Sequence, residues 1–360
     1  MITTTVILSR DNAFTIGRAV DSATRLTDNV IVIDTGSQDS TIGIARALGA
    51  KVHRLDWKDS FAAARNAAFD LVPEGLIFYL DSDEWVSPGE LEQACSILRS
   101  LDEKDRCWAP IIIDDTTGRH ALHVPRIVSA ESDLRYRYRV HERLCRGDVE
   151  AVPEQVQISV LHDGYTEEAL TNFDKQSRNL HLLELSLCEL PQDPHLLFFK
   201  LRDGLGTRSV EDNRALVAQI EESCKSAPDG AVRDFTTLAR KVVLTYEWFL
   251  RGAHQDTVAL ARQVLQAVPS DADAIYAVSV SRLIQAQSQI YESLVWLARS
   301  RQKSEEHLTW SMSETPVHLD ALIGEHLRML GDRRHEKFML EVSPEWNDWY
   351  FEGSVFGGKT

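Results

Sequence analysis

The first hundred residues alternate between short β-branched runs and segments whose apolar residues recur at helical spacing. The strand-like runs are TTTVILS, NVIVID, KVHRL and LIFYL. Helices are expected near 14–23, near 40–48, over FAAARNAAFDL and over PGELEQACSILRSL, with Pro88 in the first turn of the last one. Strands that alternate with helices form parallel βαβ units. The pattern therefore predicts an α/β domain.

After residue 102 the chain shows strand-like runs without helices between them. These runs are CWAPIII, HALHVPRIV, LRYRYRVHERL and VQISVLHDGY. We expect them to form antiparallel strands added to the parallel sheet, which would make the sheet mixed and mainly parallel. The domain is expected to cover residues 1–166.

From about Glu167 onward the apolar spacing is helical, as in NLHLLELSLCEL, TLARKVVLTYEWFL, TVALARQVLQAV and AIYAVSVSRLIQA. Proline follows helix ends at Pro191, Pro228 and Pro269, at spacings near the ~34-residue period of helix-pair repeats. This predicts an all-α, tetratricopeptide-like domain over residues 167–340. The tail, 341–360, is expected to cap the last helix pair.

Composition limits the classes of partner. The formal net charge is -16, so most of the surface would repel nucleic acid, and none is expected as a partner. The five cysteines are scattered without CxxC spacing, which favours a reducing, cytoplasmic setting. We expect neither a signal peptide nor a membrane span, because no apolar run reaches ~18 residues.

The stretch LIFYLDSDEW places three carboxylates at the end of a strand that reads as buried. In open α/β sheets, ligands bind at the carboxyl ends of the strands. Asp81 and Asp83 could aim at one point, because alternate residues of an extended segment share a face. Two carboxylates held close together favour a cation between them, and Mg²⁺ or Mn²⁺ prefers oxygen ligands. The alternative is an acidic loop that only caps the next helix.

Other chemistries that use a DxD motif fit less well. An EF-hand loop would need glycine at its sixth position, where this chain has Val86, and Pro88 lies inside the loop. A phosphatase of the haloacid dehalogenase type would need Thr or Val where Trp85 stands. Neither a Walker loop, a GxGxxG motif nor a GxSxG serine elbow is present.

Two further segments lie in the same part of the predicted fold. Asp34 ends the second strand in IDTGSQDST, where Gly36 permits a tight turn and Ser37 or Asp39 can cap the following helix. Arg65 follows a run of alanines in WKDSFAAARN, which lets a ligand or backbone approach closely. The alternatives are an ordinary strand-to-helix turn and a surface arginine.

Taken together, the motifs IDTGSQD, DWKDSFAAARN, LDSDEW, VHERL and LHDGY resemble, in this order, the family 2 glycosyltransferases of the nucleotide-sugar (GT-A) fold. The resemblance is to the branch with a helical-repeat tail, which includes enzymes that glycosylate peptides on Ser, Thr or Cys. It covers about the first 190 residues. The family's first-strand motif is close to KNE, whereas this chain has Asp11, Asn12 and Ala13.

The resemblance implies a role for each matching residue. Asp34 and Arg65 would bind the nucleotide, typically the uridine of a UDP-sugar. Asp81 would contact the ribose or the metal, and Asp83 would bind Mn²⁺ or Mg²⁺ at the diphosphate. His162 would be a third metal ligand, although a hydrogen-bonded histidine at a strand end is an alternative.

An inverting transfer needs a base that takes the proton of the acceptor. The candidates are His141 and Glu142 in RVHERL, with Glu84 as a secondary acid. If RYRYRVHE were one strand, His141 would share a face with three arginines, and Glu142 would share the other face with Tyr136 and Val140. Glu142 is favoured, because the resembled family uses a carboxylate.

The sequence thus predicts a metal-dependent, inverting glycosyltransferase that uses a nucleotide sugar and acts on a peptide, protein or glycan acceptor. The helical repeats would bind the acceptor, and a homo-oligomer formed through them is compatible with the sequence. One alternative is a non-catalytic interaction protein with a remnant transferase domain. A phosphatase or nucleotidyltransferase is the other.

Overall fold

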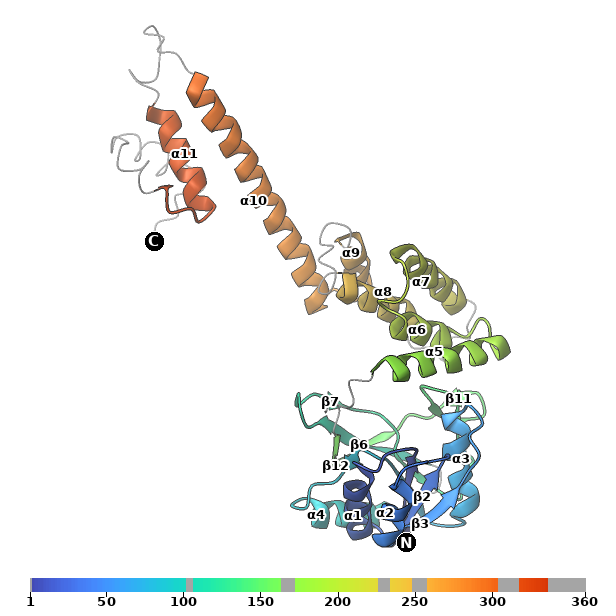
Figure 1. Cartoon of the computed structure of the whole chain (residues 1–360). Coiled ribbons are helices and arrows are strands. Elements are labelled where there is room, and N and C mark those ends of the chain that lie inside the picture. Colours follow the sequence, from blue (N-terminus) through green and yellow to red (C-terminus); the bar gives the residue numbers. More distant parts are fainter. Residues whose placement is uncertain are drawn as a thin grey trace. The chain divides into compact units, whose positions relative to one another are not determined.

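The computed structural model describes residues 2–101, 106–162, 172–225, 234–247, 258–303 and 317–335 (Figure 1). The chain forms two compact units, Met1–Ala239 and Arg240–Thr360. The first unit contains the sheet domain together with the first helices of the helical region. The expected boundary near residue 166 and the expected cap over 341–360 lie outside the described residues.

The central sheet of the first unit contains nine strands within the described residues. They are β1 (Thr3–Ser9), β2 (Asn29–Asp34), β3 (Lys51–Arg54), β4 (Leu76–Asp81), β5 (Glu84–Trp85), β6 (Cys107–Asp114), β7 (His120–Ala121), β8 (Ile127–Ser129) and β12 (Glu154–His162). Their order is β3-β2-β1-β4-β8-β6-β12-β5, and β7 pairs with β6. The first four strands lie where the apolar runs predicted them.

The sheet is mixed, as expected from the sequence. The pairs β1–β2, β1–β4 and β2–β3 are parallel, and β8 lies antiparallel between β4 and β6. One expectation was wrong: β12 runs parallel to β6 and not antiparallel. Strand β12 still carries the antiparallel strand β5 at its other edge, which brings His162 opposite Glu84.

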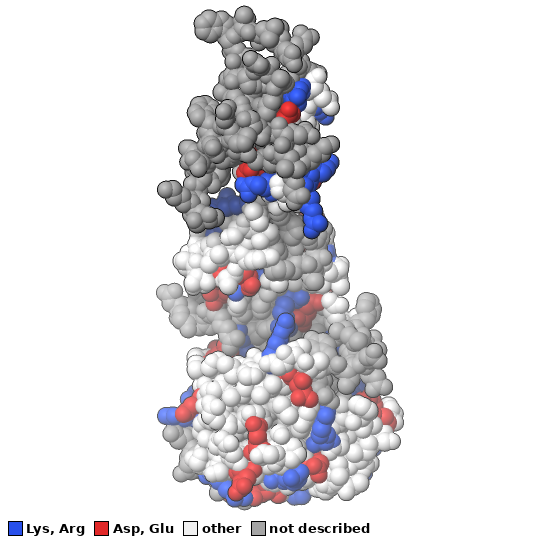
Figure 2. All heavy atoms as spheres, turned by 90° about the vertical axis from the view of Figure 1, so that its left-hand side faces the viewer, with Lys and Arg blue, Asp and Glu red and all other residues white. Residues whose placement is uncertain are grey.

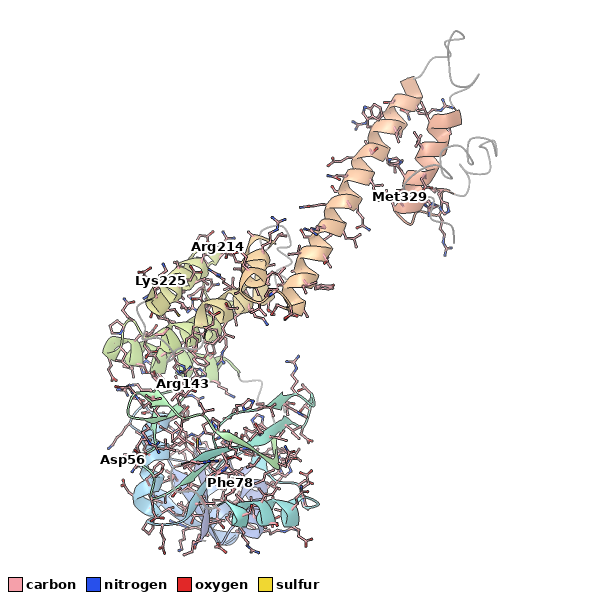
Figure 3. All side chains as sticks on the ribbon, turned by 180° about the vertical axis from the view of Figure 1, so that it is seen from behind. Asp56, Phe78, Arg143, Arg214, Lys225 and Met329 are labelled. Atoms are coloured by element: carbon pink, nitrogen blue, oxygen red, sulfur yellow. The ribbon has the colours of Figure 1, made fainter. Side chains whose placement is uncertain are left out.

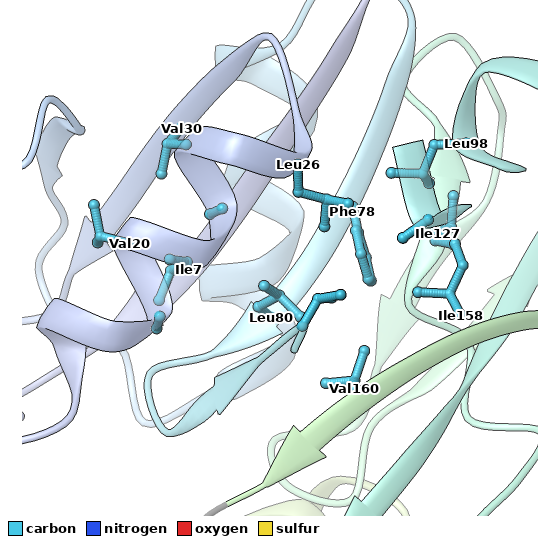
Figure 4. Close-up of a cluster of buried hydrophobic side chains, with 14 of the residues drawn as sticks. Ile7, Val20, Leu26, Val30, Phe78, Leu80, Leu98, Ile127, Ile158 and Val160 are labelled. Carbon is cyan, nitrogen blue, oxygen red and sulfur yellow. The ribbon is translucent and has the colours of Figure 1, made fainter. Parts of the chain in front are cut away.

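Helices cover both faces of this sheet. They are α1 (Ile16–Leu26), α2 (Thr41–Ala47), α3 (Phe61–Leu71) and α4 (Leu91–Ser100). Alternate residues of β4 divide between the two cores: Phe78 and Leu80 pack with α1, α2 and α4, whereas Ile77 and Tyr79 pack with α3. Figure 4 shows the first of these clusters. Pro88 does not lie in the first turn of α4, because that helix begins after Glu90.

A separate three-stranded sheet contains parts of the run LRYRYRVHERL, which does not form one continuous strand. It consists of β9 (Arg135–Arg137), β10 (Arg143–Arg146) and β11 (Val149–Glu150), in the order β11-β10-β9. Between β9 and β10 the backbone is irregular, because Tyr138 (φ 71°) and His141 (φ 55°) are left-handed. The alternation of faces therefore stops at Arg137.

The helices that follow in the first unit are α5 (Asn172–Glu189), α6 (Pro194–Asp203), α7 (Val210–Lys225) and the start of α8 (Phe235–Thr245). Helix α6 has Pro194 at its first position and Asp193 as its N-cap, which accepts hydrogen bonds from the backbone N–H groups of His195 and Leu196. Arg143 of β10, labelled in Figure 3, has its guanidinium over the ring of Phe235 of α8.

The second unit is helical throughout its described residues. It contains the rest of α8, α9 (Val258–Ala267), α10 (Ala272–Lys303) and α11 (Val317–Met329). Helix α9 packs against the start of α10 through Ala261, Val264 and Ala277, and α11 packs against its end through Leu297 and Leu327. The 32 residues of α10 extend well beyond the expected AIYAVSVSRLIQA.

The face in Figure 2 shows acidic and basic side chains interspersed among the described residues, with no large area of one sign. A bilayer-spanning helix would need a longer apolar stretch than any helix of the described residues offers. The expected α/β sheet domain followed by a helical region is confirmed.

Candidate active site

Two predicted residues lie where parallel strands end. Register places Asp34 at the end of β2 opposite Ser9 of β1, and Asp81 at the end of β4 opposite Leu8 of β1. The carboxyl ends of β1, β2 and β4 therefore form one edge, which is where α/β sheets bind ligands.

Asp34 is buried, with 1% of its surface exposed. Its Oδ1 accepts hydrogen bonds from the backbone N–H groups of Gly36 and Ser37, both at 3.1 Å, and Gly36 has φ +113°. Its Oδ2 is buried and has no hydrogen-bond partner among the described residues. Buried acceptors are rarely left unpaired, so Oδ2 is an acceptor available to a ligand donor.

The loop after β1 is tied to the loop after β2. Asp11 donates its N–H to Ser37 Oγ at 2.9 Å and accepts the N–H of Gln38 through Oδ1 at 2.7 Å. Neither expected capping residue is the N-cap of α2, which is Ser40, but Asp39 Oδ1 accepts the N–H of Thr41 at the start of that helix. These bonds fix the loop in which the family's acidic residue is replaced by Ala13.

Asp81 lies between two arginines. Arg65 of α3 donates from Nη2 to Oδ1 at 2.8 Å, and Arg126 donates from Nη2 to Oδ2 at 2.8 Å and from Nη1 to Oδ1 at 3.2 Å. Burial alone would raise the pKa of Asp81, but the charges of Arg126 and Arg65 hold it well below its usual range. Asp81 is thus a permanent carboxylate whose two oxygens are both engaged by cations.

Glu84 lies behind Asp81 and is only 2% exposed. It accepts Arg126 Nη2 at 2.7 Å through Oε1 and the N–H of Asp81 at 2.8 Å through Oε2. Burial raises the pKa of Glu84 to about 7, and the charge of Asp81 adds to this rise although Arg126 opposes it. Its contacts fit a support for Asp81 better than a secondary acid that reaches an acceptor.

Asp83 and His162 form a pair at the same edge. His162 Nε2 lies 3.2 Å from Asp83 Oδ2, with side chains 30% and 35% exposed. The hydrogen bond to Asp83 raises the pKa of His162. Among the described residues no group of three His, Cys, Asp or Glu side chains is placed to hold a metal ion. A metal at this pair would therefore take further ligands from a bound substrate or water.

The chemistry of this donor pair fits a divalent cation. A carboxylate oxygen and an imidazole nitrogen together suit Mn²⁺ well, whereas Mg²⁺ prefers oxygen ligands. Both side chains are partly exposed and face each other, so a ligand could reach them. Asp81 fits such a site less well, because both of its oxygens already accept from Arg65 and Arg126.

The two candidate bases lie in different surroundings. Glu142 joins the site through Arg65, whose Nε donates to Oε1 at 3.0 Å, and its side chain is 14% exposed. His141 instead contacts helix α6: its Nε2 lies 2.6 Å from Asp203 Oδ2, and its ring stacks on Phe199 at 4.0 Å. The structure thus connects Arg65, Asp81 and Glu142 and places His141 in a separate cluster.

Arg126 is the site residue that the sequence did not reveal. It lies 42 and 45 positions along the chain from the two carboxylates it binds, in the segment VPRIV. A single arginine before a short apolar run is an ordinary sequence feature. The only available signal was the shortage of cations near three clustered carboxylates.

Residues 5–143 match the family described as Glycosyl transferase family 2. A TPR repeat-containing protein of Synechococcus elongatus is 29% identical over 242 residues, which cover 63% of this chain and 58% of that protein. The prophage-derived glycosyltransferase SunS of Bacillus subtilis is 25% identical over 181 residues, covering 48% of this chain and 42% of that protein. The chain thus spans about half the length of these relatives.

Among solved structures, Staphylococcus aureus TarS is similar with a TM-score of 0.39 and 12% identity, over 74% of this chain and 55% of that one. The family match and the observed sheet confirm the family and the fold class expected from the sequence. The chain therefore carries a glycosyl transferase family 2 domain of the GT-A fold, followed by a helical region.

Proposed function

We propose that this protein is a metal-dependent, inverting glycosyltransferase that transfers a sugar from a nucleotide sugar, and that its donor is a UDP-sugar. The observation that carries the proposal is the continuous polar network at the strand ends. Arg65 links Glu142 to Asp81, within a domain that matches family 2 glycosyltransferases. A remnant domain would have no physical need for these buried charges, because apolar residues of similar volume in their place are often neutral or stabilising.

In this proposal Asp34 receives the nucleotide. Its Oδ2 is a buried acceptor without a partner among the described residues, and the N–H of a uracil ring would satisfy it. Arg65 contributes indirectly, because two of its nitrogens are already bound to Glu142 and Asp81. Its proposed role is to hold those two carboxylates in place.

Asp83 and His162 are the proposed metal ligands. They lie at 3.2 Å from each other at the edge that would face the diphosphate. When bound, Mn²⁺ or Mg²⁺ would stabilise the negative charge of the departing diphosphate. Asp81 keeps its carboxylate ionised beside this site and orients the two arginines.

Glu142 is the proposed general base. Arg65 occupies its Oε1, which leaves Oε2 to accept the proton of the attacking acceptor hydroxyl or thiol. His141 is the weaker candidate because Asp203 and Phe199 hold its ring. The acceptor in this proposal is a peptide, protein or glycan, and helix-pair repeats offer grooves for a peptide.

A panel of nucleotide sugars tests the proposal. With Mn²⁺ present, a UDP-sugar at ~100-fold its Kd should stabilise the protein by about 2.7 kcal/mol, seen as a rise in Tm. Asp34→Asn should lose most of this effect, whereas the exposed Asp133→Asn should keep it. If no nucleotide sugar changes the Tm and Mn²⁺ has no effect, the proposal is wrong.

A further inference from the structure

Two of the five residues before β10 adopt a backbone conformation that L-amino acids rarely take. Tyr138 has φ 71° and His141 has φ 55°, so two left-handed non-glycine residues lie within four positions. Each such residue costs about 1–3 kcal/mol and persists only where surrounding contacts impose it. The segment ends at Glu142, the proposed base.

One set of contacts holds this segment to the start of α3. The carbonyl of Arg139 accepts the N–H of Phe61 at 2.8 Å. The Arg139 guanidinium donates to the carbonyls of Lys58 and Asp59 at 3.3 and 3.0 Å, and to Glu189 of α5 at 2.6 Å. The middle of the segment is thus fixed between α3 and α5.

A second set of contacts comes from α6 and its N-cap. Tyr138 donates its hydroxyl to Asp193 at 2.9 Å, and its ring lies 4.4 Å from that of His195. His195 Nε2 lies 2.9 Å from the carbonyl oxygen of His141, and the His141 ring binds Asp203 at the other end of the helix. Val140 packs between these contacts, against Leu182, Leu183 and Leu196.

The contacts with α6 fall on both the backbone and the side chain of His141, the residue next to Glu142. Rotation of the peptide group between His141 and Glu142 would move the Glu142 carboxylate away from Arg65 Nε, which it binds at 3.0 Å. General bases must lie within hydrogen-bond reach of their proton, and a displacement of ~1 Å can cost ~100-fold in rate. The orientation of the base therefore depends on a helix outside the family 2 segment, 5–143.

We propose that α6 is part of the catalytic apparatus: His195 and Asp203 are positioning residues that lock His141 and thereby orient Glu142. This inference rests on the proposed function, in which Glu142 is the base. It assigns the first helices of the helical region a role in the sugar-transfer site itself, in addition to any binding of the acceptor.

The ionisation of Asp203 is consistent with this role. Burial would raise its pKa, but the hydrogen bond and charge of His141, together with Arg202, hold the pKa below its ordinary value. Arg202 Nη2 lies 2.8 Å from Asp203 Oδ1. The carboxylate therefore remains charged and available to His141 throughout the neutral range.

Steady-state kinetics on the full-length chain test the inference. His195→Leu and Asp203→Ala should each lower kcat about 10- to 100-fold while the KM for the nucleotide sugar changes less than about twofold. His195→Gln should recover most of the rate, because its amide N–H can donate to the same carbonyl. If His195 and Asp203 had only a structural role, their variants would give less folded protein, but kcat would not fall selectively while KM stayed constant.

A matched control lies in the same helical layer. Asn213 of α7 is 1% exposed, and its Oδ1 accepts a hydrogen bond from Arg208 Nε at 3.4 Å, away from residues 138–142. Asn213→Ala should therefore reduce stability and leave kcat unchanged. Amide hydrogen exchange gives a second readout: exchange in 138–142 should rise in His195→Leu and Asp203→Ala but not in Asn213→Ala. This measurement does not depend on activity.

The outcomes separate the two proposals. If the wild-type protein transfers sugar and both His195→Leu and Asp203→Ala keep the wild-type kcat, the catalytic role of α6 is overturned, while the proposed function still stands. Unchanged exchange in 138–142 would overturn the lock directly. A wild-type protein that transfers no sugar would refute the proposed function and the catalytic role of α6 with it, while the exchange data would still decide whether α6 locks the segment.

Discussion

Arg126 holds Asp81 through two hydrogen bonds, from Nη1 to Oδ1 at 3.2 Å and from Nη2 to Oδ2 at 2.8 Å. The same guanidinium reaches Glu84 behind it at 2.7 Å. One buried cation thus binds two carboxylates of the DSDE segment, and the planar fork of arginine suits its bidentate contact with Asp81.

Replacement of Arg126 should destabilise the protein strongly. Arg126→Met keeps the side-chain volume but leaves the buried Glu84 without its counter-charge, which should cost roughly 3 kcal/mol of unfolding free energy. Urea denaturation measures this loss. The exposed Arg119→Met should change stability by less than ~0.5 kcal/mol. Equal stability of the Arg126 and Arg119 variants would contradict the structural role assigned to Arg126.

The sheet domain was largely predictable, because its buried strands appear in the sequence as apolar runs between turn residues. The apolar run LIFYLD predicts a buried strand, and in the structure it forms β4. Ile77 and Tyr79 lie on one face of this strand, and Phe78 and Leu80 lie on the other. Periodicity does not encode the direction of pairing, however. The parallel pairing of β12 with β6 was missed for that reason.

The strand pattern alone placed the site residues that lie at strand ends, whereas Arg65 and Glu142 were named through the family resemblance. Asp34 and Asp81 could be placed because parallel strands end at a common edge. The separation of His141 from Glu142 could not be foreseen, since it depends on left-handed backbone at Tyr138 and His141. Contacts between residues some sixty positions apart, such as His141 with Asp203, leave no local pattern in the chain.

Removal of the Glu142 carboxylate should abolish transfer while donor binding persists. Glu142→Gln keeps the size of the side chain and an oxygen for Arg65 Nε, but an amide cannot accept the acceptor's proton. We expect kcat to fall about 100- to 10,000-fold, which is the usual contribution of a general base. Thermal stabilisation by the UDP-sugar should remain.

The control for this experiment is Glu74→Gln, an exposed change of the same type in the same domain. It should retain wild-type kcat. An active Glu142→Gln would exclude Glu142 as the base, and His141→Gln would then be the variant to measure.

Loss of one proposed metal ligand should weaken metal binding. Asp83→Asn removes the negative oxygen that faces His162 at 3.2 Å, so Mn²⁺ should bind more weakly in the presence of UDP. Isothermal titration of Mn²⁺ into the protein with UDP measures the change. The exposed Asp70→Asn should bind Mn²⁺ as the wild type does. An unchanged affinity in Asp83→Asn would place the metal elsewhere.

Three tyrosines should make the protein sensitive to alkali. Burial raises the pKa of Tyr136 to about 12, and it also raises the pKa values of Tyr79 and Tyr138. An unfolded tyrosine titrates near pH ~10, so the folded state binds these protons more tightly, and the stability they contribute is lost as the pH rises above ~10. Absorbance at 295 nm should therefore show some tyrosines ionising near pH ~10 and the rest only as the far-UV dichroism is lost. Tyr136→Phe should weaken this pH dependence of stability, whereas the exposed Tyr276→Phe should leave it unchanged. If all tyrosines ionised in a single step near pH ~10 while the protein stayed folded, the burial of these hydroxyls would be contradicted.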